Sequence, residues 1–314
     1  MDNEVLLSIR ELRVQYGQFL AVDGVSFDLA AGQLLGLVGP NGAGKTTTLR
    51  AAAGLQPIST GRVSVMGHDV FRDPVSAGRH LGFTPDTPTV YANLTVEQYL
   101  DFIGQCYGLD AATRVERIDH WLEQLWLRDK RIAKISALSR GMRQRLAVAR
   151  TLISDPHVIL LDEPAAGLDP AGRVEFRRLL ASLRDQGRAI VVSSHILADL
   201  ADYCTHIAIM ERGRLLRFGS VAQVAGDSEH ERCQYQVVLT HAVGDATQRL
   251  AGIDGLTRVQ VHGDRLTLEY DQDRAAAAAL LQRLLAGGFP VAEFHVLRPD
   301  LEQAYLRSGI EQVD

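Results

Sequence analysis

The sequence has few cysteines and few lysines. Its three cysteines, Cys106, Cys204 and Cys233, lie far apart in an odd number and without metal-ligand spacing. This argues against a disulfide framework and a zinc site, so we expect reduced, structural thiols. Only three of the 33 basic residues are lysines. Because lysine is rare in this chain, a lysine at a position that requires a compact ammonium group would seldom be there by chance.

Long apolar runs and a basic leader are also absent. No stretch approaches the roughly 18 uninterrupted apolar residues of a membrane span, and the start MDNEVLLSIR is acidic where a signal peptide is basic. We therefore expect a cytoplasmic chain. With 46% apolar and 23% charged residues over 314 positions, the composition fits one large globular domain and a smaller one.

The sequence contains no basic arm of the kind that binds nucleic acid. Residues 1–227 carry 25 acidic and 25 basic side chains, whereas residues 228–314 carry 13 and 8. Because the tail is acidic, we expect no nucleic-acid partner. The polar segment GDSEHERCQ resembles a linker, which predicts domains at 1–227 and 228–314.

Apolar periodicity predicts the fold class of the larger domain. Residues 6–31 alternate as antiparallel strands, and residues 93–135 have helical spacing. The apolar strands HVILLDEP and RAIVVSSH alternate with expected helices at 141–154 and 171–186. The prediction is an α/β domain with a mostly parallel sheet, an antiparallel β subdomain and a helical insert at about 90–154. In residues 228–314 the order β-α-β-β-α-β predicts a small ferredoxin-like α+β domain.

The strongest motif is GPNGAGKTT, residues 39–47, which follows the apolar run Leu34–Val38 and precedes an expected helix at 47–55. Its glycines allow successive backbone N–H groups to point at anionic oxygens, with a helix N-terminus behind them. Lys45 can reach the terminal phosphates, and Thr46 can offer its hydroxyl to a magnesium ion. The motif predicts a site for ATP and Mg²⁺ formed by Gly39, Pro40, Asn41, Gly42, Ala43, Gly44, Lys45, Thr46 and Thr47.

A second motif, VILLDEP, ends an apolar strand in Asp162 and Glu163. Ligands of parallel sheets bind at the carboxyl ends of the strands, so both carboxylates are expected there. Asp162 would hold Mg²⁺ through water, and Glu163 would orient or deprotonate the water that attacks the γ-phosphate. Alone, such a strand end could also be an acidic turn.

Taken together, the motifs resemble the ATP-binding cassette family over residues 6–220, in family order. GPNGAGKTT resembles Walker A, LSRGM a variant of the LSGGQ signature, VILLDEP Walker B, AGLDP the D-loop and SSHIL the switch. The resemblance implies a P-loop NTPase cassette in which Tyr16 stacks on adenine and His195 positions the attacking water with Glu163. It implies that Asp169 couples two ATP sites, although Ser139 and Asp169 are each also natural helix N-caps.

The resemblance further implies a head-to-tail dimer, with a second copy or a homologous ATPase. Ser139 and the Gly141 N–H of one chain would hold the γ-phosphate bound by the other, so that ATP closes the dimer and hydrolysis opens it. Two positions depart from the family pattern. Asp86 replaces the glutamine that senses magnesium, and Arg140 and Met142 alter the signature. Asp86 could still approach the metal through water.

These departures resemble the branch that pairs with separately encoded small exporter permeases. The function predicted is a transport ATPase, held at the inner face of the cell membrane by an integral membrane permease whose coupling helix docks near residues 86–108. Of the apolar residues there, Tyr91, Leu94, Tyr99 and Phe102, we expect most to be core. The alternatives are a soluble cassette ATPase acting on ribosomes or DNA, and a regulatory module whose tail senses a ligand. The tail helix, with Leu280, Leu281, Leu284 and Leu285, is expected to serve dimerisation or to be internal core.

Overall fold

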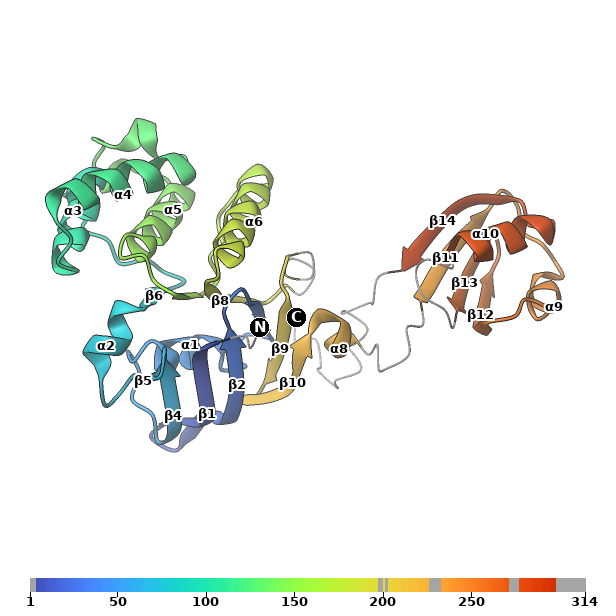
Figure 1. Cartoon of the computed structure of the whole chain (residues 1–314), viewed down its shortest axis with the longest axis horizontal. Coiled ribbons are helices and arrows are strands. Elements are labelled where there is room, and N and C mark those ends of the chain that lie inside the picture. Colours follow the sequence, from blue (N-terminus) through green and yellow to red (C-terminus); the bar gives the residue numbers. More distant parts are fainter. Residues whose placement is uncertain (1–3, 197–199, 201–202, 226–232, 271–276, 298–314) are drawn as a thin grey trace. The chain divides into compact units, whose positions relative to one another are not determined.

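The structure is a computed structural model that describes residues 4–196, 200, 203–225, 233–270 and 277–297 (Figure 1). The chain divides into two compact units, which meet in the sequence between Val221 and Ala222. The predicted boundary between residues 227 and 228 lies outside the described residues and stays a prediction. Among the described residues, no helix combines the length and the apolar character that crossing a membrane requires.

The first unit opens with an antiparallel sheet, as predicted for residues 6–31. Strands β1 (Val5–Tyr16) and β2 (Phe19–Ala30) pair closely, and β4 (Thr60–Val65) and β5 (His68–Asp69) extend the sheet in the order β2-β1-β4-β5. Alternate residues of β1 and β2 are buried and face the core. This alternation is the period of two that a half-buried strand imposes on its side chains.

The second sheet of this unit is mostly parallel, also as predicted. Its strand order is β10-β9-β3-β8-β7-β6, and the pairs among β3, β6, β7, β8 and β9 are parallel, whereas β10 is antiparallel to β9. The central strands are buried almost completely, which explains their continuous apolar runs. The carboxyl ends of β3, β7 and β8 therefore lie side by side. The strands are β3 (Leu34–Val38), β6 (Leu81–Thr84), β7 (Val158–Leu161), β8 (Ala189–Ser194), β9 (His206–Glu211) and β10 (Arg214–Ser220).

Helices follow the strands at positions close to the predicted ones. Helix α1 begins at Lys45, two residues before the predicted start, because Gly44 takes a left-handed conformation (φ 98°) and serves as N-cap. The predicted helices at 141–154 and 171–186 lie one or two residues earlier, because Ser139 and Asp169 cap them. The helices are α1 (Lys45–Ala52), α2 (Pro74–Arg79), α5 (Arg140–Leu152), α6 (Pro170–Asp185) and α8 (Val221–Ala225).

The helical insert contains α3 (Val96–Cys106) and α4 (Ala111–Gln124), with two short 3₁₀ turns at Arg128–Lys130 and Ile135–Ala137. Thr95 and Gln98 form a reciprocal capping box at the start of α3. The Arg150 guanidinium at the end of α5 donates to the Phe83 carbonyl at 2.6 Å, which ties the insert to β6.

The second unit follows the predicted order. It contains β11 (Cys233–Leu239), α9 (Ala246–Leu250), β12 (Leu256–His262), β13 (Arg265–Tyr270), α10 (Ala277–Ala286) and β14 (Val291–Leu297). The sheet is antiparallel in the order β12-β13-β11-β14, as expected of a ferredoxin-like topology. Leu280 and Leu284 are fully buried in its core, whereas Leu285 is 53% exposed. The α10 face is thus mainly internal core.

Candidate functional site

The glycine loop between β3 and α1 needs its glycines for steric reasons. A Cβ at Gly39 would lie 2.2 Å from the Met210 carbonyl oxygen, and one at Gly44 would lie 2.7 Å from the Ala21 carbonyl oxygen. Gly42 and Gly44 also have φ values of 80° and 98°, which other residues rarely adopt. The loop therefore turns tightly into the N-terminus of α1, where free backbone N–H groups favour an anion.

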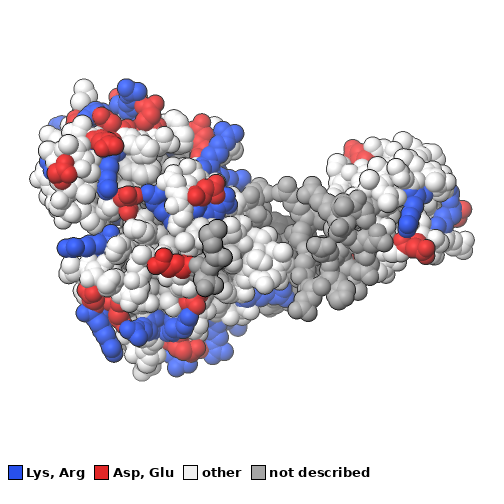
Figure 2. Space-filling model, in the orientation of Figure 1, with Lys and Arg blue, Asp and Glu red and all other residues white. Residues whose placement is uncertain are grey.

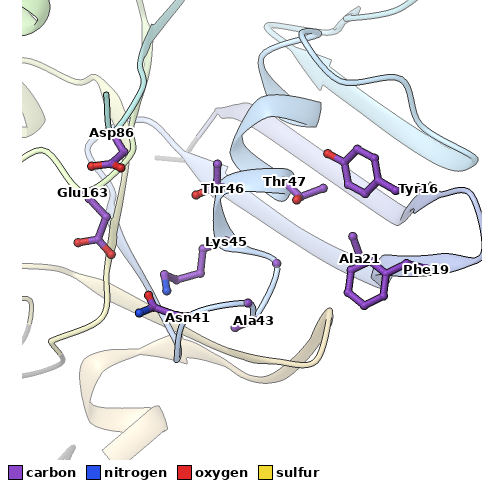
Figure 3. Close-up of a pocket in the computed structure, with 12 residues that line it drawn as sticks. Tyr16, Phe19, Ala21, Asn41, Ala43, Lys45, Thr46, Thr47, Asp86 and Glu163 are labelled. Carbon is purple, nitrogen blue, oxygen red and sulfur yellow. The ribbon is translucent and has the colours of Figure 1, made fainter. Parts of the chain in front are cut away.

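The loop forms one wall of an open pocket of about 280 Å³. Figure 3 shows the Asp86 and Glu163 carboxylates on one side, the Tyr16 and Phe19 rings on the other, and Lys45 and Thr46 between them. Residues far apart in the sequence are thus brought together at the carboxyl edge of the sheet. The lining is Tyr16, Phe19, Ala21, Asn41, Gly42, Ala43, Gly44, Lys45, Thr46, Thr47, Asp86 and Glu163.

Lys45 is nearly buried, with 7% of its surface exposed. Its Nζ donates to the Gly39 carbonyl at 2.6 Å and to the Pro40 carbonyl at 3.1 Å. Burial lowers the pKa of Lys45, whereas the charges of Glu163 and Asp162 act in the opposite direction. Phosphate oxygens in the pocket would add negative charge beside this ammonium and favour its charged form.

Asp162 has the environment of a metal-binding carboxylate. It is 1% exposed, and its Oδ1 accepts a hydrogen bond from Ser193 Oγ at 2.7 Å. Its Oδ2 is buried and has no hydrogen-bond partner among the residues that the structure describes. A buried carboxylate oxygen needs a donor or a cation. Oxygen donors from Asp162, Thr46 and Asp86 match the preference of Mg²⁺, so the residues present fit this ion.

Glu163 and His195 form a contact at the ends of β7 and β8. His195 Nδ1 lies 3.2 Å from Glu163 Oε1 and 3.1 Å from Oε2. Glu163 has a φ of 46°, a conformation uncommon outside glycine that often marks functional sites. Its backbone N–H donates to Ser193 Oγ at 2.9 Å. Ser193 was not among the residues predicted from the sequence.

Tyr16 and Phe19 flank the turn between β1 and β2 and pair across it. They are 44% and 66% exposed, and both line the pocket. Such aromatic faces suit a planar ring. Tyr16 was predicted from the sequence, whereas Phe19 and Ala21 were not, although the two-residue spacing of the turn would have indicated that Phe19 lies opposite Tyr16.

Ser139, Gly141 and Asp169 do not line the pocket among the described residues. Ser139 Oγ accepts from Met142 N at 3.2 Å, and Asp169 Oδ1 accepts from Gly172 N at 3.0 Å, so both cap their helices. Gly141 lies against the loop before Asp169, since its Cβ would be 2.9 Å from the Gly167 carbonyl. The LSRGM and AGLDP motifs therefore lie next to each other, outside the pocket lining.

A hollow of about 490 Å³ lies beside the start of the helical insert. Its lining includes Tyr91, which is 59% exposed, and Phe102, which is 44% exposed. The expectation that most of the apolar residues here are core is wrong for these two. Only Tyr99, at 2% exposure, is fully core, and Leu94 is partly buried. Tyr91 packs edge-on against Phe102 with ring centroids 5.9 Å apart.

Comparisons with known proteins agree with this geometry. The sequence pattern of a family described as ABC transporter matches residues 22–166. Nod factor export ATP-binding protein I of Ralstonia nicotianae is 35% identical over 283 residues, which cover 90% of this chain and 79% of that protein. Linearmycin resistance ATP-binding protein LnrL of Bacillus subtilis is 28% identical and covers 96% of this chain and 97% of its own length.

A further relative, the probable multidrug ABC transporter ATP-binding protein YbhF of Escherichia coli, is 35% identical over 75% of this chain, but the match spans only 41% of YbhF. Among solved structures, an ATP-binding subunit of an ABC transporter superposes with a TM-score of 0.67 at 28% identity, covering 71% of this chain and 92% of that one. The ADP conformation of the cassette MJ1267 gives 0.61 at 25% identity, with coverage of 71% and 96%.

Proposed function

The chain belongs to the ABC transporter family as an ATP-hydrolysing, ATP-binding protein, and on this premise we propose that it drives a separate exporter permease by ATP-dependent closure of a dimer. Its relatives act in Nod factor export and linearmycin resistance and, in one probable case, multidrug transport. These names favour an exporter. In the proposed complex the permease selects the transported substrate.

The separation of the two halves of the ATP site supports the dimer. One chain supplies the pocket with Lys45, whereas its Ser139 and Gly141 lie outside that pocket. The N-terminus of α5 can hold phosphate oxygens, because its first N–H groups lack acceptors within the helix. A second copy turned head to tail would place this N-terminus opposite the glycine loop of the first.

The pocket residues, together with Asp162 and His195 beside Glu163, have complementary tasks in the hydrolysis of ATP to ADP and phosphate. Glu163 accepts a proton from the water whose oxygen bonds to the γ-phosphorus, while the bond from that phosphorus to the ADP oxygen breaks. His195 holds the Glu163 carboxylate in place. Lys45 binds the terminal phosphates, and Tyr16 with Phe19 binds the base. Mg²⁺, held by Thr46 and Asp162 with Asp86 nearby, would neutralise charge on the phosphates.

The hollow at Tyr91 and Phe102 supports the membrane partner. Exposed aromatic residues beside a concavity are typical of protein contacts, and we assign this surface to a cytoplasmic helix of the permease. The chain would then lie at the inner face of the membrane. On the face seen in Figure 2, basic and acidic side chains of the first unit are intermixed, which does not favour the alternative of an ATPase acting on ribosomes or DNA.

The test is fractionation of cells that produce the full chain and its native membrane proteins. Wild-type chain should sediment with membranes and, after mild detergent, co-purify with a polytopic protein. Tyr91→Ala with Phe102→Ala should release it into the soluble fraction while the isolated chain keeps its ATPase rate within about twofold, because neither side chain lines the ATP pocket.

The matched control is Ile132→Ala, which removes an apolar side chain that is 81% exposed elsewhere on the same insert. It should stay with the membrane. Wild-type chain recovered with ribosomes or chromosomal DNA, and absent from membranes, would contradict the proposed partner.

A further inference from the structure

One buried hydroxyl contacts Asp162 and Glu163, the two acidic residues that follow β7. Ser193 lies near the end of β8 and is 1% exposed. Its Oγ donates to Asp162 Oδ1 at 2.7 Å and accepts from the backbone N–H of Glu163 at 2.9 Å. The next serine, Ser194, is different, because its hydroxyl accepts from the backbone N–H of Ile196 at 3.0 Å and donates to the Ile196 carbonyl at 3.3 Å.

The direction of these two hydrogen bonds follows from the groups involved. An ionised carboxylate only accepts and an amide N–H only donates, so the single proton of the hydroxyl is directed to Asp162. This occupies Oδ1 and leaves Oδ2, which is buried without a hydrogen-bond partner among the described residues, as the oxygen available to a cation.

The contact to Glu163 lies just beyond the regular pairing of the sheet. The last β7–β8 pair is Leu161 with Val192. After it, the Glu163 N–H bonds to the Ser193 side chain, and the Glu163 backbone turns to a φ of 46°. The Ser193 hydroxyl therefore accepts from the Glu163 N–H, which the turn takes out of the β7–β8 hydrogen-bond ladder.

We propose that Ser193 is a positioning residue that orients the metal-binding carboxylate of Asp162 and the backbone of Glu163 through one hydroxyl. This rests on the proposed role of Mg²⁺ at Asp162. Removing the hydroxyl frees Asp162 to rotate and Glu163 to relax, which weakens the metal site and misplaces the carboxylate that acts on water. Groups that orient a metal ligand typically change metal affinity by about 10- to 100-fold.

The experiment measures binding of a non-hydrolysable ATP analogue to the full chain by calorimetry, with increasing Mg²⁺ and in EDTA. Ser193→Ala should raise the half-saturating Mg²⁺ concentration about tenfold and leave binding in EDTA unchanged. Ser193→Thr, which keeps the hydroxyl, should restore the wild-type value, and Ser193→Cys, with its weak S–H donor, should lie between.

Thr151→Val is the matched control. Thr151 is 5% exposed, and its hydroxyl bonds Thr84 Oγ1 at 2.7 Å and the Phe83 and Ala147 carbonyls, none of which is a carboxylate. It should lower the unfolding temperature without altering the Mg²⁺ requirement. A folded Ser193→Ala chain with a Mg²⁺ requirement within twofold of wild type would overturn the role of Ser193. A wild-type chain whose nucleotide binding ignores Mg²⁺ would instead overturn the metal site, and the role of Ser193 with it.

Discussion

His195 Nδ1 lies 3.1 Å from Glu163 Oε2, which joins the ends of two neighbouring parallel strands. The Glu163 side chain is 20% exposed and that of His195 is 55% exposed. The carboxylate is thus the more buried member of the pair. In the proposed mechanism the contact restricts where the carboxylate meets the attacking water, and it depends on both strands ending at the same level of the sheet.

His195→Ala should reduce ATP hydrolysis about 100-fold, because a misplaced reacting group loses about this much rate. ATP binding should stay within about twofold of wild type, since His195 does not line the pocket. Steady-state kinetics and nucleotide titration of the full chain measure the two effects. The control is His241→Ala, an exposed histidine of the second unit. Equal rates for both variants would refute the assigned role.

Gly39→Ala should destabilise the first unit and abolish nucleotide binding. Its Cβ would lie 2.2 Å from the Met210 carbonyl oxygen, so the loop or β9 must move. Gly78→Ala is the comparison, because its Cβ meets no described atom within 4 Å in the last turn of α2. We expect that variant to gain about 0.5–1 kcal/mol in free energy of unfolding. Urea unfolding of both chains checks this, and an unchanged midpoint for Gly39→Ala would contradict it.

Tyr16→Ala and Phe19→Ala should each raise the KM for ATP about fivefold or more, because stacking of a base on an aromatic ring contributes about 1–3 kcal/mol. The rate at saturating ATP should change little. Tyr107→Ala serves as control, since Tyr107 is 45% exposed and does not line the pocket. If Tyr16→Ala and Phe19→Ala have the same KM as this control, the base of ATP does not stack on these two rings.

Patterns local in the sequence predicted most of the fold. The glycine loop, the buried strands and the order of elements in the second unit all depend on near neighbours, and they were confirmed. The start of α1 at Lys45 was missed, because helical periodicity does not reveal that Gly44 adopts a left-handed φ and caps the helix. The exact first and last residues of a helix depend on the backbone conformation of single residues such as Gly44.

The candidate site was harder to complete from the sequence. Ser193 ends an apolar strand like many serines, and its two contacts reach a strand some 30 residues earlier. Most of Tyr91, Leu94, Tyr99 and Phe102 were expected to be core, but Tyr91 and Phe102 are exposed, because a sequence pattern shows which residues are apolar and not whether anything covers them. Contacts between distant segments and the covering of a face are set by tertiary packing.

Deleting residues 228–314 should leave a folded first unit. The core clusters of the two units share no residue, and the second cluster lies wholly within residues 235–294. The truncated chain should unfold cooperatively within a few degrees of the full chain's first transition, as followed by circular dichroism. If the tail serves dimerisation, the same truncation should weaken ATP-dependent pairing. Loss of all cooperative unfolding would show that the predicted boundary is wrong.

The most direct test of the proposed dimer is the mass of Glu163→Gln chain in saturating ATP and Mg²⁺, measured by light scattering. The amide cannot accept a proton from water, so hydrolysis should fall at least about 100-fold and the closed state should accumulate. We predict twice the 34.4 kDa chain mass, and a return to monomer when Ser139→Arg is added. A Glu163→Gln chain that binds ATP and remains at 34.4 kDa would contradict it.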